Sequence, residues 1–298
     1  METLHLCGLG DEGGRTLDQQ IGVIAELGWS RVELRTLDER PVHELGEASL
    51  LRVTERLGKA GVSVPVVASA IGNWERPIGC PFDQEVAELD AILSVARMLG
   101  SPYVRMMSYP NDGRRETSWR DEVVRRIGAL VERAEAAGIV LLLENCAGWA
   151  SQHPERALDL LAAVDSPALG ILFDLGNPVA YGYDGLAYLA GVLPYVRHIH
   201  VKDGVATDGG EPVFTMAGEG DADVHGCLAT AIEGGYRGCL SIEPELSRVF
   251  HLGKSSGDDV LRSSFLGYAK RFERLLRRIV PGSSVREGAL RMPSGVPG

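Results

Sequence analysis

The sequence lacks any paired arrangement of cysteine residues. Its five cysteines are an odd number and stand in widely separated contexts: Cys7, Cys80, Cys146, Cys227 and Cys239. This spacing forms neither a disulfide framework nor the closely spaced cysteine pairs of a structural zinc site. We therefore expect free thiols in a reducing compartment.

An excess of positive charge is also absent. The 298-residue chain has 30 lysines and arginines against 41 aspartates and glutamates, which gives a formal net charge of −11. This balance argues against a nucleic-acid-binding surface and favours small molecules as binding partners. A homo-oligomer is also possible.

Membrane-spanning and targeting segments are missing as well. No apolar run approaches the roughly 20 residues that a membrane-spanning helix needs. The opening residues, METLHLCGLG, lack the basic segment and apolar stretch of a secretory signal peptide. We expect a cytoplasmic protein that contacts no membrane.

The sequence does contain a regular alternation of strand-like and helix-like segments. Each of eight apolar runs is followed by a stretch whose apolar residues fall at helical spacing, as in residues 18–29. The eight runs lie at residues 4–9, 31–35, 62–71, 103–109, 139–145, 169–174, 196–204 and 239–246. Alternating strands and helices indicate a parallel sheet covered by helices. Because eight such units in roughly 250 residues are typical of a closed barrel, we predict an α/β protein with a single (β/α)8 TIM barrel.

No linker divides the chain, so we predict one domain at residues 1–280. No strand is followed directly by a glycine-rich dinucleotide-binding motif, and we interpret GEG at residues 218–220 as a tight turn before a helix. From residue 281 the sequence PGSSVREGALRMPSGVPG loses helical periodicity and gains proline, glycine and serine. We predict that residues 281–298 form a flexible C-terminal tail.

Ligand-type side chains stand at or near the ends of four of the later runs. Glu144, Asp174 and Glu243 each close an apolar run, and His200 lies near the end of the seventh. The C-terminal ends of barrel strands meet at one face, and neighbouring strands are about 4.8 Å apart, so these residues can converge. Several carboxylates buried together need a compensating cation. Three carboxylates and one imidazole suit a divalent ion, for which we expect Mn²⁺ ahead of Mg²⁺, Co²⁺ or Zn²⁺.

The motifs around these residues resemble the xylose-isomerase-like superfamily of sugar and sugar phosphate isomerases and epimerases. The likeness covers most of the second half of the chain, and the first half only through its strand–helix rhythm. It is carried by ENCAG at 144–148, LGILFDLGN at 169–177, HIHVKD at 198–203, GEGD at 218–221 and GYRGCLSIE at 235–243. The resemblance implies a TIM barrel with one divalent metal held by Glu144, Asp174, His200 and Glu243. It also implies that Glu144 and Glu243 act as the acid/base pair.

The chemistry of such a site fits these residue types. A metal that binds a ketose through its carbonyl and neighbouring hydroxyl would acidify the α-proton and stabilise an enediolate. One glutamate then removes the proton. Its return to the opposite face gives an epimer, and its return to the adjacent carbon gives an aldose–ketose isomer. The sequence leaves both outcomes open.

Several neighbouring residues are candidates for substrate binding. Lys202 can hold a substrate oxygen or pair with Asp203. Asn177 stands three residues after Asp174, where many relatives have a histidine, and can form hydrogen bonds but cannot donate a proton as a cation. Trp74 lies in a strand–helix loop, where an aromatic ring can close a sugar site, and Arg105 can line the pocket or form a salt bridge.

The remaining candidates have structural alternatives. Trp149 lies in another strand–helix loop. Glu33 and Arg35 can line the pocket, although a solvated or salt-bridged role is the simpler interpretation. We expect His198 to support its strand and to face away from His200.

The same residues could serve functions other than isomerisation or epimerisation. A lyase could use the same enolisation, either as a dehydratase of an inositol-like ketone or in cleavage of a C-glycoside. The related metal-dependent endonucleases use extra histidines, which are absent here from VVASAIGN and VRMMSY, so that function is disfavoured. A non-catalytic sugar-binding barrel is disfavoured because all four proposed ligands are present. Phosphorylation of the substrate stays open, since Gly204, Gly218 and Gly220 would allow close approach of a phosphate.

Overall fold

Parallel strands form the closed wall of a barrel in the computed structural model, which describes residues 3–208, 210–249 and 253–292. Pairing is parallel throughout and follows the order β1 (Thr3–Gly8), β11 (Cys239–Ile242), β8 (Val196–Val201), β7 (Leu169–Asp174), β6 (Val140–Gly148), β5 (Tyr103–Ser108) and β4 (Val66–Ala68). Residues 31–35 complete the circle, because parallel bridges join Leu9 to Glu33 and Leu34 to Val67. The predicted single-domain TIM barrel is confirmed.

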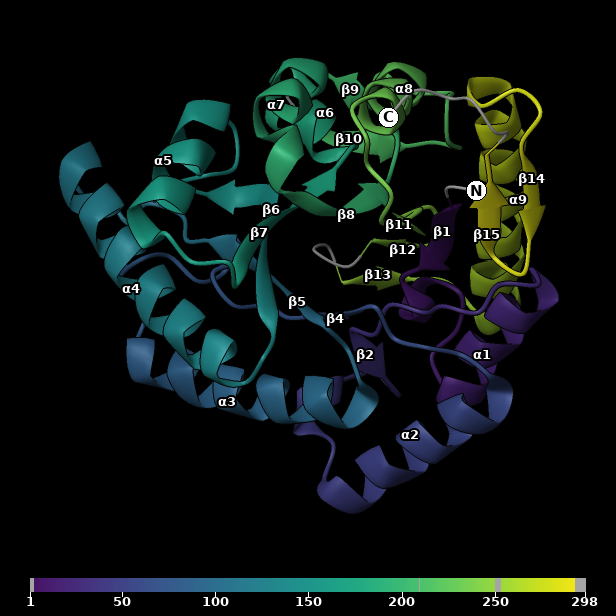
Figure 1. The fold of residues 1–298 in the computed structure, drawn as a ribbon, viewed down its shortest axis with the longest axis horizontal. Coiled ribbons are helices and arrows are strands. Elements are labelled where there is room, and N and C mark those ends of the chain that lie inside the picture. The colour runs from purple at the N-terminus through teal and green to yellow at the C-terminus, as the bar shows by residue number, and fades with distance from the viewer. Residues whose placement is uncertain (1–2, 209, 250–252, 293–298) are drawn as a thin grey trace.

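Helices surround this wall as an outer ring (Figure 1). They are α1 (Leu17–Glu26), α2 (Glu47–Ala60), α3 (Phe82–Leu99), α4 (Glu116–Ala136), α5 (Pro154–Val164), α7 (Gly185–Val192), α8 (Val224–Glu233) and α9 (Asp258–Ile279). Local sequence sets several of their ends. Thr16 and Gln19 form a capping box at the start of α1. Gly61 ends α2 in the left-handed conformation that glycine adopts without strain.

The barrel interior changes character along its axis. Near its N-terminal end, Val66, Leu142 and Leu172 form a small buried apolar cluster. Residues two apart on a strand share a face, so the inward positions that follow Leu142 and Leu172 are Glu144 and Asp174. The strands therefore place a layer of carboxylates at the C-terminal end of the barrel, directly above an apolar layer.

Extra elements lie on the loops that follow the later strands. A short helix, α6 (Asn177–Tyr181), follows β7, and a hairpin of β9 (Gly204–Thr207) and β10 (Gly210–Phe214) follows β8. A second hairpin, β12 (Arg248–Val249) with β13 (Lys254–Ser255), follows β11. A third small hairpin, β2 (Thr36–Leu37) with β3 (Arg40–Pro41), follows residues 31–35. The C-terminal face of the barrel thus carries most of the additional structure.

The C-terminal segment differs from the predicted flexible tail. Strands β14 (Ser284–Arg286) and β15 (Ala289–Arg291) form a hairpin, and β15 pairs antiparallel with β1 (Figure 1). Leu290 and Met292 are buried in the main core. The prediction failed because a short strand with few apolar residues is recognised only when its partner is known; residues 293–298 lie outside the described part of the chain. Among the described residues, no helix combines the length and apolarity needed to cross a membrane.

Candidate metal centre

Four buried side chains converge at the C-terminal end of the barrel. Glu144, Asp174, His200 and Glu243 each offer a ligand atom, and these atoms all lie within 4.8 Å of one another. The Nδ1 atom of His200 is 3.2 Å from Glu243 Oε2, 3.7 Å from Glu144 Oε1 and 3.8 Å from Asp174 Oδ2. The sequence-based set of candidate ligands is therefore brought together in space.

Strand register explains this convergence. Asp174 is paired with His200 across β7 and β8, and His200 is paired with Ser241 across β8 and β11. Glu243 follows β11 and stays in register, since its backbone N–H donates to the carbonyl of Val201. Parallel strands in this register deliver their final side chains to one level of the barrel.

Fixed positive charges hold the two glutamates in their ionised form. Burial raises the pKa of Glu144, but Arg105, whose guanidinium lies 3.2 Å from Glu144 Oε2, brings the pKa below its usual value. Burial also raises the pKa of Glu243, but Lys202, His200 and Arg35 together hold it well below its usual value. Each carboxylate is thus ready to bind a cation or to accept a proton.

The remaining charges indicate a space suited to a cation. Burial, together with Glu243 and Glu144, raises the pKa of Asp174 to about 7 despite the nearby Lys202. Burial lowers the pKa of His200, but Glu33 and Glu243 raise it well above the ordinary value. In the described part of the chain, His200 Nδ1 is buried and makes no hydrogen bond, while Asp174 Oδ2 and Glu144 Oε2 are contacted by the ion-paired side chains of Lys202 and Arg105. A divalent ion fits these donors, because it would neutralise crowded carboxylates and replace a proton on the imidazole.

Lys202 is part of the same charge cluster. Its Nζ atom lies 3.2 Å from Asp174 Oδ2, 3.2 Å from Glu243 Oε2 and 3.7 Å from Glu245 Oε2. These contacts raise the pKa of Lys202 well above its usual value even though burial lowers it. The sequence left two roles open for Lys202, contact with a substrate oxygen or pairing with Asp203. In the structure Lys202 pairs with other carboxylates instead of Asp203.

Asp203 instead organises the turn that follows the β9–β10 hairpin. Its carboxylate accepts hydrogen bonds from five backbone N–H groups, those of Gly204, Gly218, Glu219, Gly220 and Ala222, at 2.8–3.2 Å. Residue 220 must be glycine, because a Cβ atom there would lie 2.3 Å from Asp203 Oδ1. The interpretation of GEG as a tight turn is confirmed.

Besides Lys202, two of the predicted substrate-binding residues touch the ligand set directly. Asn177 begins α6 and donates through Nδ2 to Glu144 Oε1 at 3.2 Å. Arg105 is buried, pairs with Glu144 and also donates to the carbonyl of Ser69. Both residues therefore orient Glu144.

The two tryptophans have different surroundings. Trp74 packs against Met107, Cys146 and Ala147, which lie at the C-terminal ends of β5 and β6 beside Glu144. Trp149 is buried in the main core, where its ring makes an edge-on contact with Trp119 at 5.1 Å. Trp74 thus remains a candidate pocket residue, while Trp149 packs in the core.

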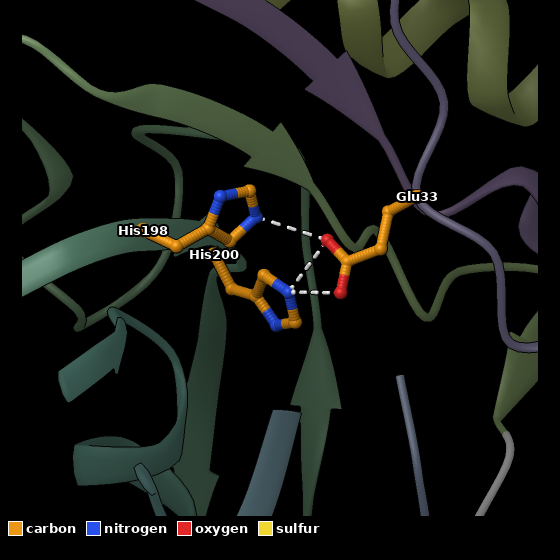
Figure 2. Close-up of side chains that lie close together, drawn as sticks. All are labelled: Glu33, His198 and His200. Carbon is orange, nitrogen blue, oxygen red and sulfur yellow. Dashed lines mark hydrogen bonds and ion pairs between the residues drawn. The ribbon is translucent and has the colours of Figure 1, made fainter. Parts of the chain in front are cut away.

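The expected orientation of His198 was wrong. His198 and His200 are two residues apart on β8, so they share a face, and both Nε2 atoms lie 3.0 Å from Glu33 Oε2 (Figure 2). Glu33 is neither solvated nor at the margin of the pocket, since it is fully buried inside the barrel.

Three charged residues near the ligand set, Asp11, Glu12 and Glu245, were not predicted from the sequence, whereas Arg35 has the salt-bridged role that the sequence favoured. Arg35 donates to both oxygens of Asp11 at 3.0 Å and lies 3.2 Å from Glu243 Oε1. Glu12 accepts a hydrogen bond from the backbone N–H of Glu245 at 2.7 Å. The available signals were that Asp11 and Glu12 closely follow β1, and that Glu245 lies two residues after Glu243.

Comparisons with known proteins find an epimerase and a dehydratase among the relatives of this chain. The chain is 33% identical over 193 residues to 2-epi-5-epi-valiolone 7-phosphate 2-epimerase of Actinoplanes sp., covering 63% of this chain and 66% of that protein. It is 28% identical over 147 residues to inosose dehydratase of Clostridium perfringens, covering 44% of this chain and 48% of that enzyme. The chain thus spans about two thirds and about half of the lengths of these relatives.

A solved structure supports the fold independently. The zinc-bound IOLI protein superposes with a TM-score of 0.75 at 16% identity, covering 93% of this chain and 100% of that one. The family described as "Xylose isomerase-like TIM barrel" matches residues 21–264. Together with the barrel and its buried ligand cluster, this match establishes that the chain belongs to the xylose isomerase-like TIM barrel family.

Proposed function

We propose that this protein is a divalent-metal-dependent epimerase or isomerase of a sugar or polyol ketone. The observation that carries the proposal is the buried set of Glu144, Asp174, His200 and Glu243, whose ligand atoms lie within 4.8 Å of one another. When bound there, a divalent ion would polarise the substrate carbonyl and stabilise the charge that develops on its oxygen. Mn²⁺ is the ion that we expect.

Glu144 and Glu243 are the proposed acid/base pair. They come from β6 and from the end of β11, which are separated in the sheet by β7 and β8, so they flank the site. Their lowered pKa values leave both ionised, and either can remove the proton next to the carbonyl. If the other returns it to the opposite face, the product is an epimer.

The proposed substrate contacts lie around this pair. The Nζ atom of Lys202 is cationic and close to Asp174 and Glu243, so it can hold a substrate oxygen next to the reacting carbon. Asn177 offers an amide beside Glu144, and Trp74 supplies an apolar surface. Arg105 keeps Glu144 ionised from behind.

We propose further that the substrate carries no phosphate on the β8–β11 side of the pocket. TIM barrels often bind phosphate with the loops after the last two strands. Here the backbone N–H groups of residues 218–220 already donate to Asp203. On the same side of the pocket, Glu12 and Glu245 each offer a carboxylate oxygen within 4.8 Å of one from Glu243. Such surroundings favour neutral hydroxyl groups over a phosphate. Measured kcat/KM values for matched substrates with and without phosphate test this point.

A dehydratase is the second candidate, supported by the similarity to inosose dehydratase. Like the epimerase, it would begin with removal of the α-proton by a glutamate. It would differ in the next step, when a hydroxyl on the β-carbon leaves as water instead of the proton returning to carbon.

The deciding experiment follows the α-proton. The protein is stripped of metal, resupplied separately with Mn²⁺, Mg²⁺, Co²⁺ or Zn²⁺, and incubated in D₂O with a panel of ketoses and inososes. We expect NMR to detect replacement of the α-proton by solvent deuterium when one of these ions is present, and we expect this exchange to be fastest with Mn²⁺. Mass spectrometry distinguishes an epimer, whose mass rises only by the deuterium taken up at carbon, from a product that has lost water. The absence of exchange across the whole panel with every ion would contradict the proposal.

A further inference from the structure

Glu33 and two histidines form a closed cluster beneath the proposed metal ligands. Glu33 Oε2 lies 3.0 Å from the Nε2 atoms of both His198 and His200, and Glu33 Oε1 lies 3.1 Å from Nε2 of His200. Figure 2 shows the carboxylate pointing at the two imidazole rings from the opposite side of the barrel interior. All three side chains are fully buried.

The chemistry of these groups fixes the positions of the hydrogens. An ionised carboxylate only accepts hydrogen bonds, so each Nε2 atom that approaches it at this distance must carry a proton. The carboxylate of Glu33 faces both Nε2 atoms at 3.0–3.1 Å, and a carboxylate held between two imidazole N–H donors needs no proton of its own. His198 and His200 therefore both donate to Glu33 through Nε2.

This arrangement leaves one nitrogen of His200 facing the proposed metal. Its Nδ1 atom points toward Glu144, Asp174 and Glu243 at 3.2–3.8 Å and has no hydrogen-bond partner among the described residues. Histidines that bind metals commonly donate their second N–H to a carboxylate, which fixes the ring and its tautomer.

We propose that Glu33 is a positioning residue that holds the Nε2–H of His200, so that Nδ1 is the atom presented to the metal. His198 acts as the second donor that fixes the Glu33 carboxylate between the two rings. This inference rests on the proposed metal-dependent function, and it adds a role that the ligand set alone does not assign.

Zinc provides a diamagnetic probe of this role. NMR of the ¹⁵N-histidine-labelled protein with one equivalent of Zn²⁺ identifies which ring nitrogen is bound to the ion and which carries hydrogen. We expect His200 to bind zinc through Nδ1 and to retain a slowly exchanging Nε2–H. Zinc bound through Nε2 of His200, or a zinc ion held by Glu33 and His198 themselves, would overturn the inference.

Two substitutions test whether Glu33 is responsible. The side-chain amide introduced by Glu33→Gln has one acceptor oxygen for two donors, so we expect zinc affinity to fall about 10- to 100-fold, as for other outer partners of metal ligands. Glu33→Asp keeps the charge and is expected to restore part of that loss. Calorimetric titration measures both. The slowly exchanging Nε2–H signal of His200 should be lost in Glu33→Gln and present in Glu33→Asp.

A matched control separates this role from general destabilisation. Glu85→Gln makes the same change at another buried carboxylate, which accepts a hydrogen bond from Gly72 and lies outside the ligand set. We expect its zinc affinity to be within twofold of the wild type. If Glu33→Gln binds zinc as tightly as the wild type, the role of Glu33 is refuted while the metal site stands. If the wild type itself binds no divalent ion, the proposed function fails first.

Discussion

Replacing Asp203 by asparagine is expected to lower the free energy of unfolding by about 3–5 kcal/mol. The fully buried carboxylate accepts three hydrogen bonds at Oδ2, from the backbone of residues 218–220, and two at Oδ1, from Gly204 and Ala222. Asparagine keeps one acceptor oxygen and places an NH₂ donor against the other set of N–H groups. The substitution therefore removes two or three bonds to a charged acceptor.

The magnitude follows from these lost bonds. Each hydrogen bond to a charged group contributes about 1.5–3 kcal/mol, so two or three together amount to about 3–9 kcal/mol. Gly218 and Glu219 are exposed, so water can replace part of the hydrogen bonding that their N–H groups lose. The expected loss of stability therefore lies near the lower end of this range.

Urea unfolding measures the effect. The urea concentration at the midpoint of unfolding should be lower for Asp203→Asn than for the wild type. The slope of the unfolding free energy against urea concentration should be the same for both proteins. Asp83→Asn, at an exposed position in the first turn of α3, is the control and should change stability by less than about 0.5 kcal/mol. A loss below about 1 kcal/mol for Asp203→Asn would refute the reasoning that this carboxylate holds the turn.

Four further predictions concern the site, the ion, the tail and the pH dependence. Glu144→Gln and Glu243→Gln should each slow α-proton exchange by about 10²–10⁴-fold, measured by NMR in D₂O. The control Trp149→Phe should exchange the α-proton at the wild-type rate. Resupplying Mn²⁺ to stripped protein at a hundred times its Kd should add about 2.7 kcal/mol of stability in thermal melts; no shift would argue against an ion at this site. Deleting residues 282–298 should cost about 3–6 kcal/mol in urea unfolding, because Leu290 and Met292 lose their burial, whereas a flexible tail predicts no change. Two neighbouring arginines lower the pKa of Glu122 to about 2, so its stabilising effect is present above pH 5 and is lost between pH 5 and pH 2. Because the side chain is partly exposed, Glu122→Gln should flatten this acid limb by about 0.2–1 kcal/mol, and an unchanged limb would contradict the pairing.

Much of the architecture could be predicted because it depends on local patterns. The eight apolar runs, each followed by a helical repeat, gave the barrel, and the residues that close those runs gave Glu144, Asp174 and Glu243. Parallel strands end at one face of a barrel, so position along the strand was sufficient to predict that these side chains meet. His200 could be assigned for the same reason.

Other features depended on contacts between distant segments. Glu33 meets His198 and His200 across the barrel, 165 and 167 residues apart in sequence, and no local pattern indicates that contact. Arg35 joins Asp11 to Glu243 in the same way. The pairing of β15 with β1 likewise joins the two ends of the chain.

Local patterns were enough to specify the strand–helix rhythm, the barrel and the four ligand-type residues, because periodicity and strand ends are properties of short stretches of the chain. The folded barrel was needed to show which ring nitrogen of His200 faces the carboxylates and which charges neutralise them. It was also needed to show that Asp203 accepts hydrogen bonds from the N–H groups of the glycine turn. The physical reason is that electrostatic interactions and hydrogen bonds depend on distances across the barrel, which are set once all eight strands are in register.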